Sequence, residues 1–478
     1  MPNSVILKEN TYFDSITLMS ISSKIQGLDG ITSVQVAMGT DHNKMLLKDA
    51  GMWEEEAQSA SPNDLLIAFS SRAGDQKKAV LELIDQLLFS DKADESSQGN
   101  GTKEFKRIPD ALKHNPDLNL ALISVPGEYA AREAKQALEH GLHVMMFSDN
   151  VSIDDERLLK ELAMEKDLLM MGPDCGTAII NGKGLGFSNK VKKGNIGIVG
   201  ASGTGIQEST VLLDRLGLGI THAIGTGGRD LKREIGALTM KQGLRLLEKD
   251  PHTEIIVLIS KTPDKDVARD LLACLQSFNK PVVVCFMGHF ESQEAERFIP
   301  IFSNLTDATI HVASLLNVSA EILRQSEVEK PLLQKSQTKI YGLFCGGTLC
   351  SEAEHIIGKS HTFIDFGDDE YTKGKPHPMI DPSTRNDAFL HYAKKDDAAV
   401  LLFDIVLGYG SHEDPAGNLA PVIRKIRQEK DVLFIASVCG TESDPQVYSR
   451  QVSQLKELGV IVASSNANAA ELAKSIIQ

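Results

Sequence analysis

Residues 195–209 read NIGIVGASGTGIQES, and this stretch constrains the fold more than any other part of the chain. The β-branched run Ile196–Val199 predicts a buried parallel strand. The glycine-rich turn 200–205 follows, and an amphipathic pattern then predicts a helix to about Leu216. Strands that turn directly into helices are the repeating unit of α/β proteins, so the sequence predicts a parallel sheet flanked by helices.

The same unit recurs along most of the chain, which predicts several doubly wound parallel sheets of Rossmann or flavodoxin type. Changes of pattern give the expected domain boundaries. They are a small α+β domain of ferredoxin-like type at 1–90, a flexible loop at 91–104, a Rossmann-like unit at 105–193, a flavodoxin-type domain at 194–325 with its last strand near Thr309–Val312, a linker at 326–338 and a further α/β domain at 339–478.

The start of the helix after Gly203 favours an anion. Its first N–H groups have no partner within the helix, and the helix dipole is positive there, so phosphate or carboxylate is the expected ligand. Ser202 and Thr204 are suited to cap the helix and to donate to that anion. The turn has neither the GxGxxG nor the GxxxxGK[ST] spacing. A turn that serves packing alone remains the alternative.

Composition excludes several classes of function. The net charge of −15 and an aromatic content of 5% argue against nucleic acid binding. No apolar run reaches the roughly 20 residues of a membrane span, and the first residues lack a signal-peptide pattern. The six cysteines are scattered without metal-site spacing, so we expect no metal and a reduced, cytoplasmic protein.

Several motifs resemble a known family. MMGPDCGTAIINGKG followed by GNIGIVGASGTG resembles the α subunit of succinyl-CoA ligase and NDP-forming acyl-CoA synthetases, and 339–478 resembles the carboxy-terminal domain of the β subunit. The motifs ISVPGEYAAREA, IGTGGRDL, GDDEYTKGKPHPMIDP, VLGYGSHEDPA and IASVCGTESDPQ are similar to the FdrA family and the related YahF proteins. Together these motifs span about residues 118–450.

The resemblance implies a phosphate shared by two helix N-termini. The two expected here are the helix after Gly203-Thr204 and the one after Gly410-Ser411. The phosphate- and substrate-binding candidates are Ser202, Gly203, Thr204, Gly227, Gly346, Gly347, Thr348, Gly408, Gly410, Ser411, Cys439, Gly440 and Thr441.

The positions at which the sequence departs from the ligase motifs are as informative as the matches. The Gly-rich turn that binds CoA in the ligases is missing, so CoA is possible but no cofactor is certain. His289 is a weak match to the ligase phosphohistidine, and its supporting carboxylate is replaced by Ser260-Lys261-Thr262-Pro263. The 478 residues are filled by the units above, which leaves no room for an ATP-grasp domain.

The resemblance implies a subunit of an acyl- or carbamoyltransferase that uses phosphate as substrate, of the oxamate carbamoyltransferase type in allantoin and oxalurate breakdown. Partner subunits and an oligomer are expected. One alternative is an NDP-forming acyl-CoA synthetase subunit that works with a separate ATP-grasp chain. A second is a non-catalytic scaffold or regulatory paralogue.

Three residues are candidates for catalysis, each with a structural alternative. His377 suits acid–base work near the anion-binding Lys373 and Lys375, unless this charged loop is simply solvated. Arg229 suits a bidentate carboxylate clamp, or is a surface residue at a helix start. Asp174 suits a base or an amide-orienting group, or only forms its turn. Cys175 and Cys439 are expected to be buried, inert thiols, because no His lies beside them in sequence.

Overall fold

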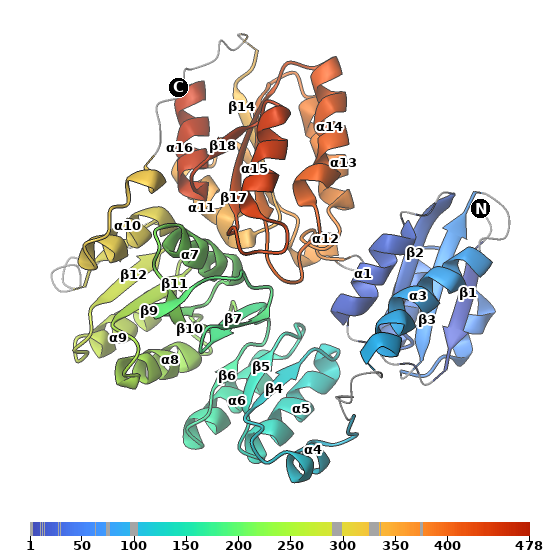
Figure 1. The fold of residues 1–478 in the computed structure, drawn as a ribbon, viewed down its shortest axis with the longest axis horizontal. Coiled ribbons are helices and arrows are strands. Elements are labelled where there is room, and N and C mark those ends of the chain that lie inside the picture. Colours follow the sequence, from blue (N-terminus) through green and yellow to red (C-terminus); the bar gives the residue numbers. More distant parts are fainter. Residues whose placement is uncertain are drawn as a thin grey trace. The chain divides into compact units, whose positions relative to one another are not determined.

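The computed structural model comprises two compact units, Met1–Asp117 with Asp369–Asp381 and Leu118–Asp368 with Pro382–Gln478 (Figure 1). The structure describes residues 3–9, 11, 13, 15–26, 28, 30–62, 64–72, 77–95, 104–288, 299–324, 334, 336–372 and 376–478. No helix in these ranges is long and apolar enough to cross a membrane.

The first unit contains an antiparallel sheet in the order β1-β3-β2. The strands are β1 (Asn3–Lys8), β2 (Ile31–Met38) and β3 (Leu65–Ser71), and the helices are α1 (Ser15–Gln26), α2 (Asp41–Asp49), η1 (Glu55–Ser59), α3 (Lys77–Glu95), α4 (Ile108–His114) and α12 (Asp369–Thr372). Every residue of the central strand β3 is buried. Ile67 belongs to the same core as Ile25 of α1 and Val80 of α3, whereas Leu66 and Leu47 of α2 belong to a second core. Because side chains alternate along a strand, this sheet is covered on both faces.

Helix α3 is longer than the sequence predicts. It continues to Glu95, inside the 91–104 segment that we expected to be a flexible loop. Residues 91–95 are Asp, Lys, Ala, Asp and Glu, which a helix tolerates, and the first glycine comes only at Gly99. Residues 96–103 lie outside the described part of the chain.

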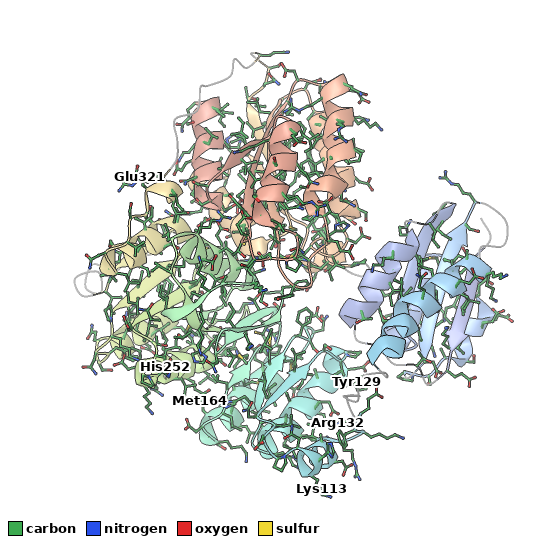
Figure 2. The ribbon with its side chains drawn as sticks, in the orientation of Figure 1. Lys113, Tyr129, Arg132, Met164, His252 and Glu321 are labelled. Carbon is green, nitrogen blue, oxygen red and sulfur yellow. The ribbon has the colours of Figure 1, made fainter. Side chains whose placement is uncertain are left out.

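The second unit begins with a small parallel sheet in the order β4-β5-β6. Its elements are β4 (Leu120–Ile123), α5 (Gly127–Glu139), β5 (His143–Met146), α6 (Ile153–Glu165) and β6 (Met170–Met171). Helix α6 has the bounds that the sequence predicts, because Ser152 caps it and acidic residues fill its first turn. Tyr129 and Arg132 of α5 and Met164 of α6 lie on the outer side of the layer (Figure 2).

A seven-stranded sheet follows, in the order β13-β12-β11-β9-β10-β7-β8. The strands are β7 (Thr177–Ile180), β8 (Lys183–Gly186), β9 (Lys193–Gly200), β10 (Ile220–Gly225), β11 (Ile255–Ser260), β12 (Val282–Phe286) and β13 (Ile301–Phe302). The helices are α7 (Gly203–Arg215), α8 (Leu238–Lys249), α9 (Lys265–Leu275) and α10 (Leu305–Leu315), with the 3₁₀ turn η2 (Glu321–Leu323) after them. Strands β9 to β13 pair in parallel, as expected, and α7 starts at the carboxyl end of the central strand β9.

Two predictions in this sheet need correction. The hairpin β7-β8 was not expected; it turns at Asn181-Gly182, where both residues have positive φ, the preferred chemistry of a two-residue hairpin. The strand expected near Thr309–Val312 is wrong, since these residues lie within α10. Asn304 caps that helix through the Asp307 amide, and this local bond outweighs the β-branched residues that follow.

The last sheet is parallel throughout, in the order β15-β14-β16-β17-β18. Its strands are β14 (Lys339–Phe344), β15 (Thr362–Asp365), β16 (Ala398–Val406), β17 (Leu433–Cys439) and β18 (Ile461–Ala463), and its helices are α11 (Gly347–Ile357), α13 (Ser383–Ala393), α14 (Pro415–Glu429), α15 (Tyr448–Glu457) and α16 (Asn466–Ile477). The fold is therefore α/β with several parallel sheets, preceded by a small domain with an antiparallel sheet, as the sequence predicts.

Candidate functional site

Two helix N-termini from different sheets meet in the second unit. Helix α7 follows β9, α11 follows β14, and the two helices are in contact. The Ser202 Oγ, which caps α7 by accepting from the Gly205 amide, lies 2.5 Å from the Thr348 Oγ1 of α11. The Thr348 amide donates to the Thr204 Oγ1 at 3.4 Å. The hydroxyl groups of both helix starts therefore form one buried junction.

Glycine allows this close approach. Gly346 is the N-cap of α11, and a Cβ there would lie 3.0 Å from the Thr204 Cγ2 and 2.9 Å from the Asp404 Oδ2. A side chain at position 346 would push the two helices apart. The turn Gly346-Gly347 thus matters for the approach of two backbones rather than for an unusual φ.

Several backbone donors at the junction remain free among the described residues. The amides of Gly203 and Thr204 in α7 and of Gly347 and Leu349 in α11 precede the first intrahelical bonds, which begin at Ile206 and Cys350. None of these four groups donates to a described residue. Free N–H groups at two helix starts, each carrying about half a positive charge from its dipole, form a site suited to an anion.

A buried ion pair holds the turn that precedes α11 in place. The Asp404 carboxylate accepts from the amides of Cys345 and Gly346 at 2.9 and 2.8 Å, and from the Arg385 Nη1 at 3.0 Å. Arg385 is 1% exposed and Asp404 is fully buried. The Arg385 charge compensates the carboxylate, so this pair fixes the turn without adding net charge to the junction.

Cys345 is an inert thiol at this position. Its Sγ lies 3.2 Å from the Asp404 Oδ1, and burial together with that carboxylate raises the pKa of Cys345 well above its usual range. Burial likewise raises the pKa of Cys175 to about 12, and it raises the pKa of Cys439 well above its usual range. Since the thiolate is the nucleophile, all three cysteines are unreactive, which agrees with the expectation for Cys175 and Cys439.

The second helix of the pair differs from the expected one. The prediction used the helix after Gly410-Ser411, but α14 begins only at Pro415, with Asp414 as its cap. Gly408 lies against Ser188, and the Tyr409 amide donates to the Ser188 carbonyl. The sequence places a glycine turn after four of the five strands of the last sheet, so it could not tell which turn faces α7.

The Cys439-Gly440-Thr441 turn joins the two large sheets of the second unit. Arg215 of α7 donates to the carbonyls of Val438, Gly440 and Ser464. The Thr441 Oγ1 donates to the Lys190 carbonyl at 2.8 Å. These contacts give this turn a structural role in the fold.

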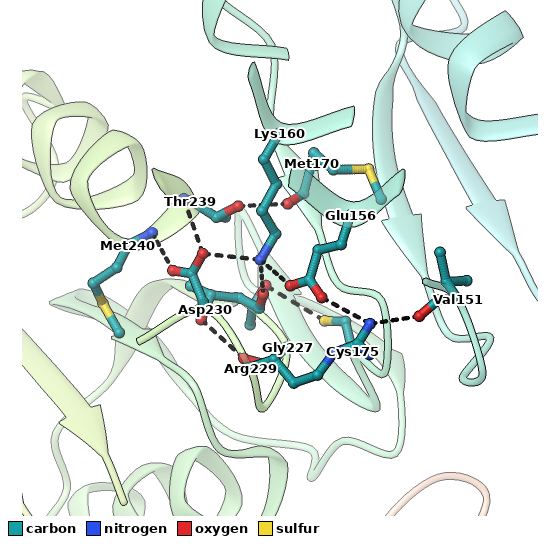
Figure 3. A network of polar contacts seen from close by, with 12 residues as sticks. Val151, Glu156, Lys160, Met170, Cys175, Gly227, Arg229, Asp230, Thr239 and Met240 are labelled. Carbon is teal, nitrogen blue, oxygen red and sulfur yellow. Dashed lines mark hydrogen bonds and ion pairs between the residues drawn. The ribbon is translucent and has the colours of Figure 1, made fainter. Parts of the chain in front are cut away.

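Asp174, Gly227 and Arg229 come together at a separate place. A Cβ at Gly227 would overlap the Pro173 carbonyl, and a Cβ at Gly228 would lie 3.6 Å from the Asp174 Oδ2. Arg229 is bound already: its Nη2 lies 2.9 Å from the Val151 carbonyl and 2.8 Å from the Glu156 Oε2 (Figure 3). A substrate carboxylate would therefore have to share Arg229 with Glu156.

The rest of this network ties α6 to the 226–230 turn. The Lys160 Nζ lies 2.8 Å from both the Glu156 Oε1 and the Asp230 Oδ1, and it donates to the Thr226 carbonyl at 2.9 Å (Figure 3). Lys160, Glu156 and Asp230 are buried. Two cations and two carboxylates balance, so this cluster is complete without a bound ion.

His377 lies in the 369–381 segment of the first unit. Burial lowers the pKa of His377 to about 4, and its Nδ1 accepts from the Met379 amide at 3.2 Å. At neutral pH the ring is therefore uncharged and a weak base. Lys373, Lys375 and His289 lie outside the described residues.

Three segments of the chain match known protein families. Residues 343–476 match the CoA-ligase family, 191–288 match the CoA binding domain, and 1–105 match the AllF heavy metal-associated domain. YahF of Escherichia coli (strain K12) is 43% identical over 513 aligned positions, which cover 100% of this chain and 99% of YahF. The chain belongs to the FdrA/YahF family.

More distant relatives share only part of the chain. The α subunit of ADP-forming succinate–CoA ligase from Aquifex aeolicus is 28% identical over 39% of this chain and 62% of that subunit. Among solved structures, the dinucleotide-forming acetyl-coenzyme A synthetase 1 of Ca. Korarchaeum cryptofilum aligns with a TM-score of 0.37 and 15% identity, covering 79% of this chain and 87% of that one. The matches to the CoA-ligase and CoA binding domain families agree with the succinyl-CoA ligase-like motifs of the sequence.

The heavy metal-associated domain of this family member lacks thiol ligands. The first cysteine in the chain is Cys175, so residues 1–105 contain none. The described residues also hold no group of three or more His, Cys, Asp or Glu side chains placed to bind a metal ion. In this chain the domain offers no thiolate metal site.

Four charged residues near the junction are not identified as site residues by the sequence patterns, namely Lys261, Asp365, Arg385 and Asp404. Lys261 directly follows β11 and Asp365 ends β15, so their places at the carboxyl ends of parallel strands were an available signal. Arg385 lies within α13, and nothing in its local sequence indicates that it is buried.

Proposed function

We propose that the chain is a subunit of an acyl- or carbamoyltransferase that binds phosphate at the α7–α11 junction. The observation that carries the proposal is the set of four free amides, Gly203, Thr204, Gly347 and Leu349, at two facing helix starts. The reaction we propose converts oxalurate and phosphate into oxamate and carbamoyl phosphate, a step of allantoin and oxalurate breakdown.

The chemistry fits a site made of oriented donors. A phosphate oxygen attacks the carbamoyl carbon, the C–O bond to phosphate forms, and the C–N bond to oxamate breaks. The proton of hydrogen phosphate ends on the amide nitrogen that leaves, so the reaction balances without a nucleotide. Amides fixed at the junction would stabilise the charge on the phosphate and the carbonyl oxygen, and positioning of both substrates would lower the barrier further.

A second candidate is an NDP-forming acyl-CoA synthetase subunit that works with a separate ATP-grasp chain. The match of residues 191–288 to the CoA binding domain favours it. Both candidates use phosphate, and they differ in whether CoA and a nucleotide take part. Partner subunits are expected in either case.

The deciding experiment compares the two reactions in one preparation. The full chain, with and without candidate partner chains, is given oxalurate and phosphate, and carbamoyl phosphate is followed by ³¹P NMR. In parallel, radiolabelled ATP, CoA and succinate are supplied and acid-labile phosphoprotein is sought. Carbamoyl phosphate without nucleotide supports the transferase, whereas phosphoprotein that requires ATP supports the synthetase.

Variants connect the activity to the junction. Ser202→Ala and Thr348→Ala remove the hydroxyl groups that face each other, and we expect weaker phosphate binding and slower turnover. Ser314→Ala, an exposed hydroxyl on α10, is the matched control. Wild-type phosphate affinity in both junction variants would contradict the proposed site.

A further inference from the structure

Two charged side chains from different sheets flank the start of α11. Lys261 follows β11, and Asp365 is the last residue of β15. A Cβ placed on Gly347 would lie 3.3 Å from the Lys261 Nζ and would overlap the Asp365 Oδ2. Both charges therefore lie against the backbone of the residue whose amide is free at the junction.

The two charges differ in how they are held. The Asp365 carboxylate accepts from the Gly367 amide at 2.9 Å, and the residue is partly buried. Lys261 is exposed and forms no hydrogen bond or ion pair with any residue in the described ranges. The nearby Asp404 is already compensated by Arg385. Lys261 is thus a cation available to a ligand at this place.

We infer that Lys261 is the cationic ligand of a phosphate or acyl-phosphate dianion at the α7–α11 junction, and that Asp365 takes up a proton when the dianion binds. The inference rests on the proposed function and adds the recognition of the anion to it. The dianion draws the Lys261 ammonium to itself, and Asp365 is then left beside a like charge.

The surroundings of Asp365 support proton uptake. Burial raises the pKa of Asp365 to about 6, and the Asp404 and Asp368 carboxylates raise it too, while the Gly367 amide and the Lys261 ammonium oppose this rise. A dianion that engages Lys261 weakens one opposing influence and adds negative charge. Both effects raise the pKa further, so the carboxyl group becomes protonated near neutral pH.

A protonated Asp365 beside phosphate has a use in the proposed reaction. Its proton can pass to the amide nitrogen that leaves as the C–N bond breaks, and the carboxylate can regain a proton from the attacking hydrogen phosphate. No other reactant is required. This step makes Asp365 a proton relay and Lys261 an anion-binding residue.

The test measures anion binding by the full chain, apart from turnover. Sulfate is the probe because it is a dianion that does not titrate near neutral pH, and inorganic phosphate is measured alongside it. We expect Lys261→Met to weaken sulfate binding by about tenfold or more, as loss of a charge-assisted contact does, and Lys261→Arg to restore most of it. Lys249→Met, an exposed lysine at the end of α8, is the control and should bind as wild type does.

Asp365→Asn tests whether Asp365 takes up a proton when the anion binds. Calorimetry in two buffers of different ionisation enthalpy at pH 6.5–7 should show proton uptake with sulfate in the wild type and none in Asp365→Asn, which should bind sulfate at least as tightly. Wild-type sulfate affinity in Lys261→Met, or unchanged proton uptake in Asp365→Asn, would overturn the inference and leave the proposed function standing. A wild-type chain that binds neither anion would refute the junction as an anion site, and with it both proposals.

Discussion

Arg385→Met is the most informative perturbation of the support beneath the site. The Arg385 Nη1 lies 3.0 Å from the Asp404 Oδ1, 2.8 Å from the Asp404 carbonyl and 3.3 Å from the Cys345 Sγ. Methionine fills much of the volume and leaves the fully buried Asp404 with two backbone donors and no counter-charge. Breaking a buried pair from one side costs about 3–5 kcal/mol.

This cost should be visible in thermal unfolding of the full chain. For a unit of about 350 residues this cost corresponds to a fall of about 4–7 °C in the melting transition of the second unit. Arg424→Met, an exposed arginine on α14, should change the transition by less than about 1 °C. The double variant Arg385→Met with Asp404→Asn removes both charges, so it should be less destabilised than the sum of the two single variants.

Two outcomes would refute this reasoning. A melting transition of Arg385→Met equal to that of wild type would mean that Asp404 needs no counter-charge. Strict additivity in the double variant would mean that the two residues do not act as a pair. We also expect Arg385→Met to weaken phosphate binding at temperatures where the chain is folded, because Asp404 holds the amides of Cys345 and Gly346 in the α11 turn.

Three further predictions concern the rest of the second unit. Gly347→Ala adds a methyl group that overlaps Asp365 Oδ2 and approaches Lys261, so phosphate affinity measured by calorimetry should fall at least about tenfold. Gly358→Ala, at the far end of α11, strains a residue with a φ of +104° and lowers stability, yet it should leave the phosphate affinity of the folded chain unchanged. Burial raises the pKa of Glu352 to about 7 from an ordinary value of 4.5, so the folded state holds a proton that the unfolded state releases, and about 3 kcal/mol of stability is lost as pH rises from about 4.5 to 7. Glu352→Gln should make the melting temperature less dependent on pH across this window, and an unchanged pH dependence would contradict the prediction. Lys160→Met leaves buried carboxylates with one counter-charge fewer and should cost about 3–5 kcal/mol in chemical unfolding, far more than the exposed Lys166→Met.

The class of the fold and the local elements of the candidate site could be predicted from the sequence, but the pairing of those elements could not. Ile196–Val199 and the turn after it predict a strand and an anion-binding helix start, and β9 and α7 confirm both elements. Both elements have local sequence signals, because a strand buried on both faces and a helix cap are each encoded by a few consecutive residues. Anion binding itself stays a prediction.

The partner of α7 could not be predicted, because the choice between α11 and α14 depends on how two sheets pack. The turn 408–411 resembles the turn 346–348 in composition, yet Ser188 meets the first and Thr204 the second. Lys261 and Arg385 were missed for the same reason. The role of a charged residue depends on its neighbours from distant segments, and no local sequence pattern predicts those neighbours.

The bond between Ser202 and Thr348 joins residues 146 positions apart in the chain. Contacts between residues so far apart in the sequence form after the segments on each side have organised. The anion site should therefore assemble late in the folding of the second unit and be among the first parts to be lost under mild denaturation. A chain under stress would stop binding phosphate while its sheets still give the circular dichroism of a folded protein, so ligand binding would report damage well before any measure of secondary structure does.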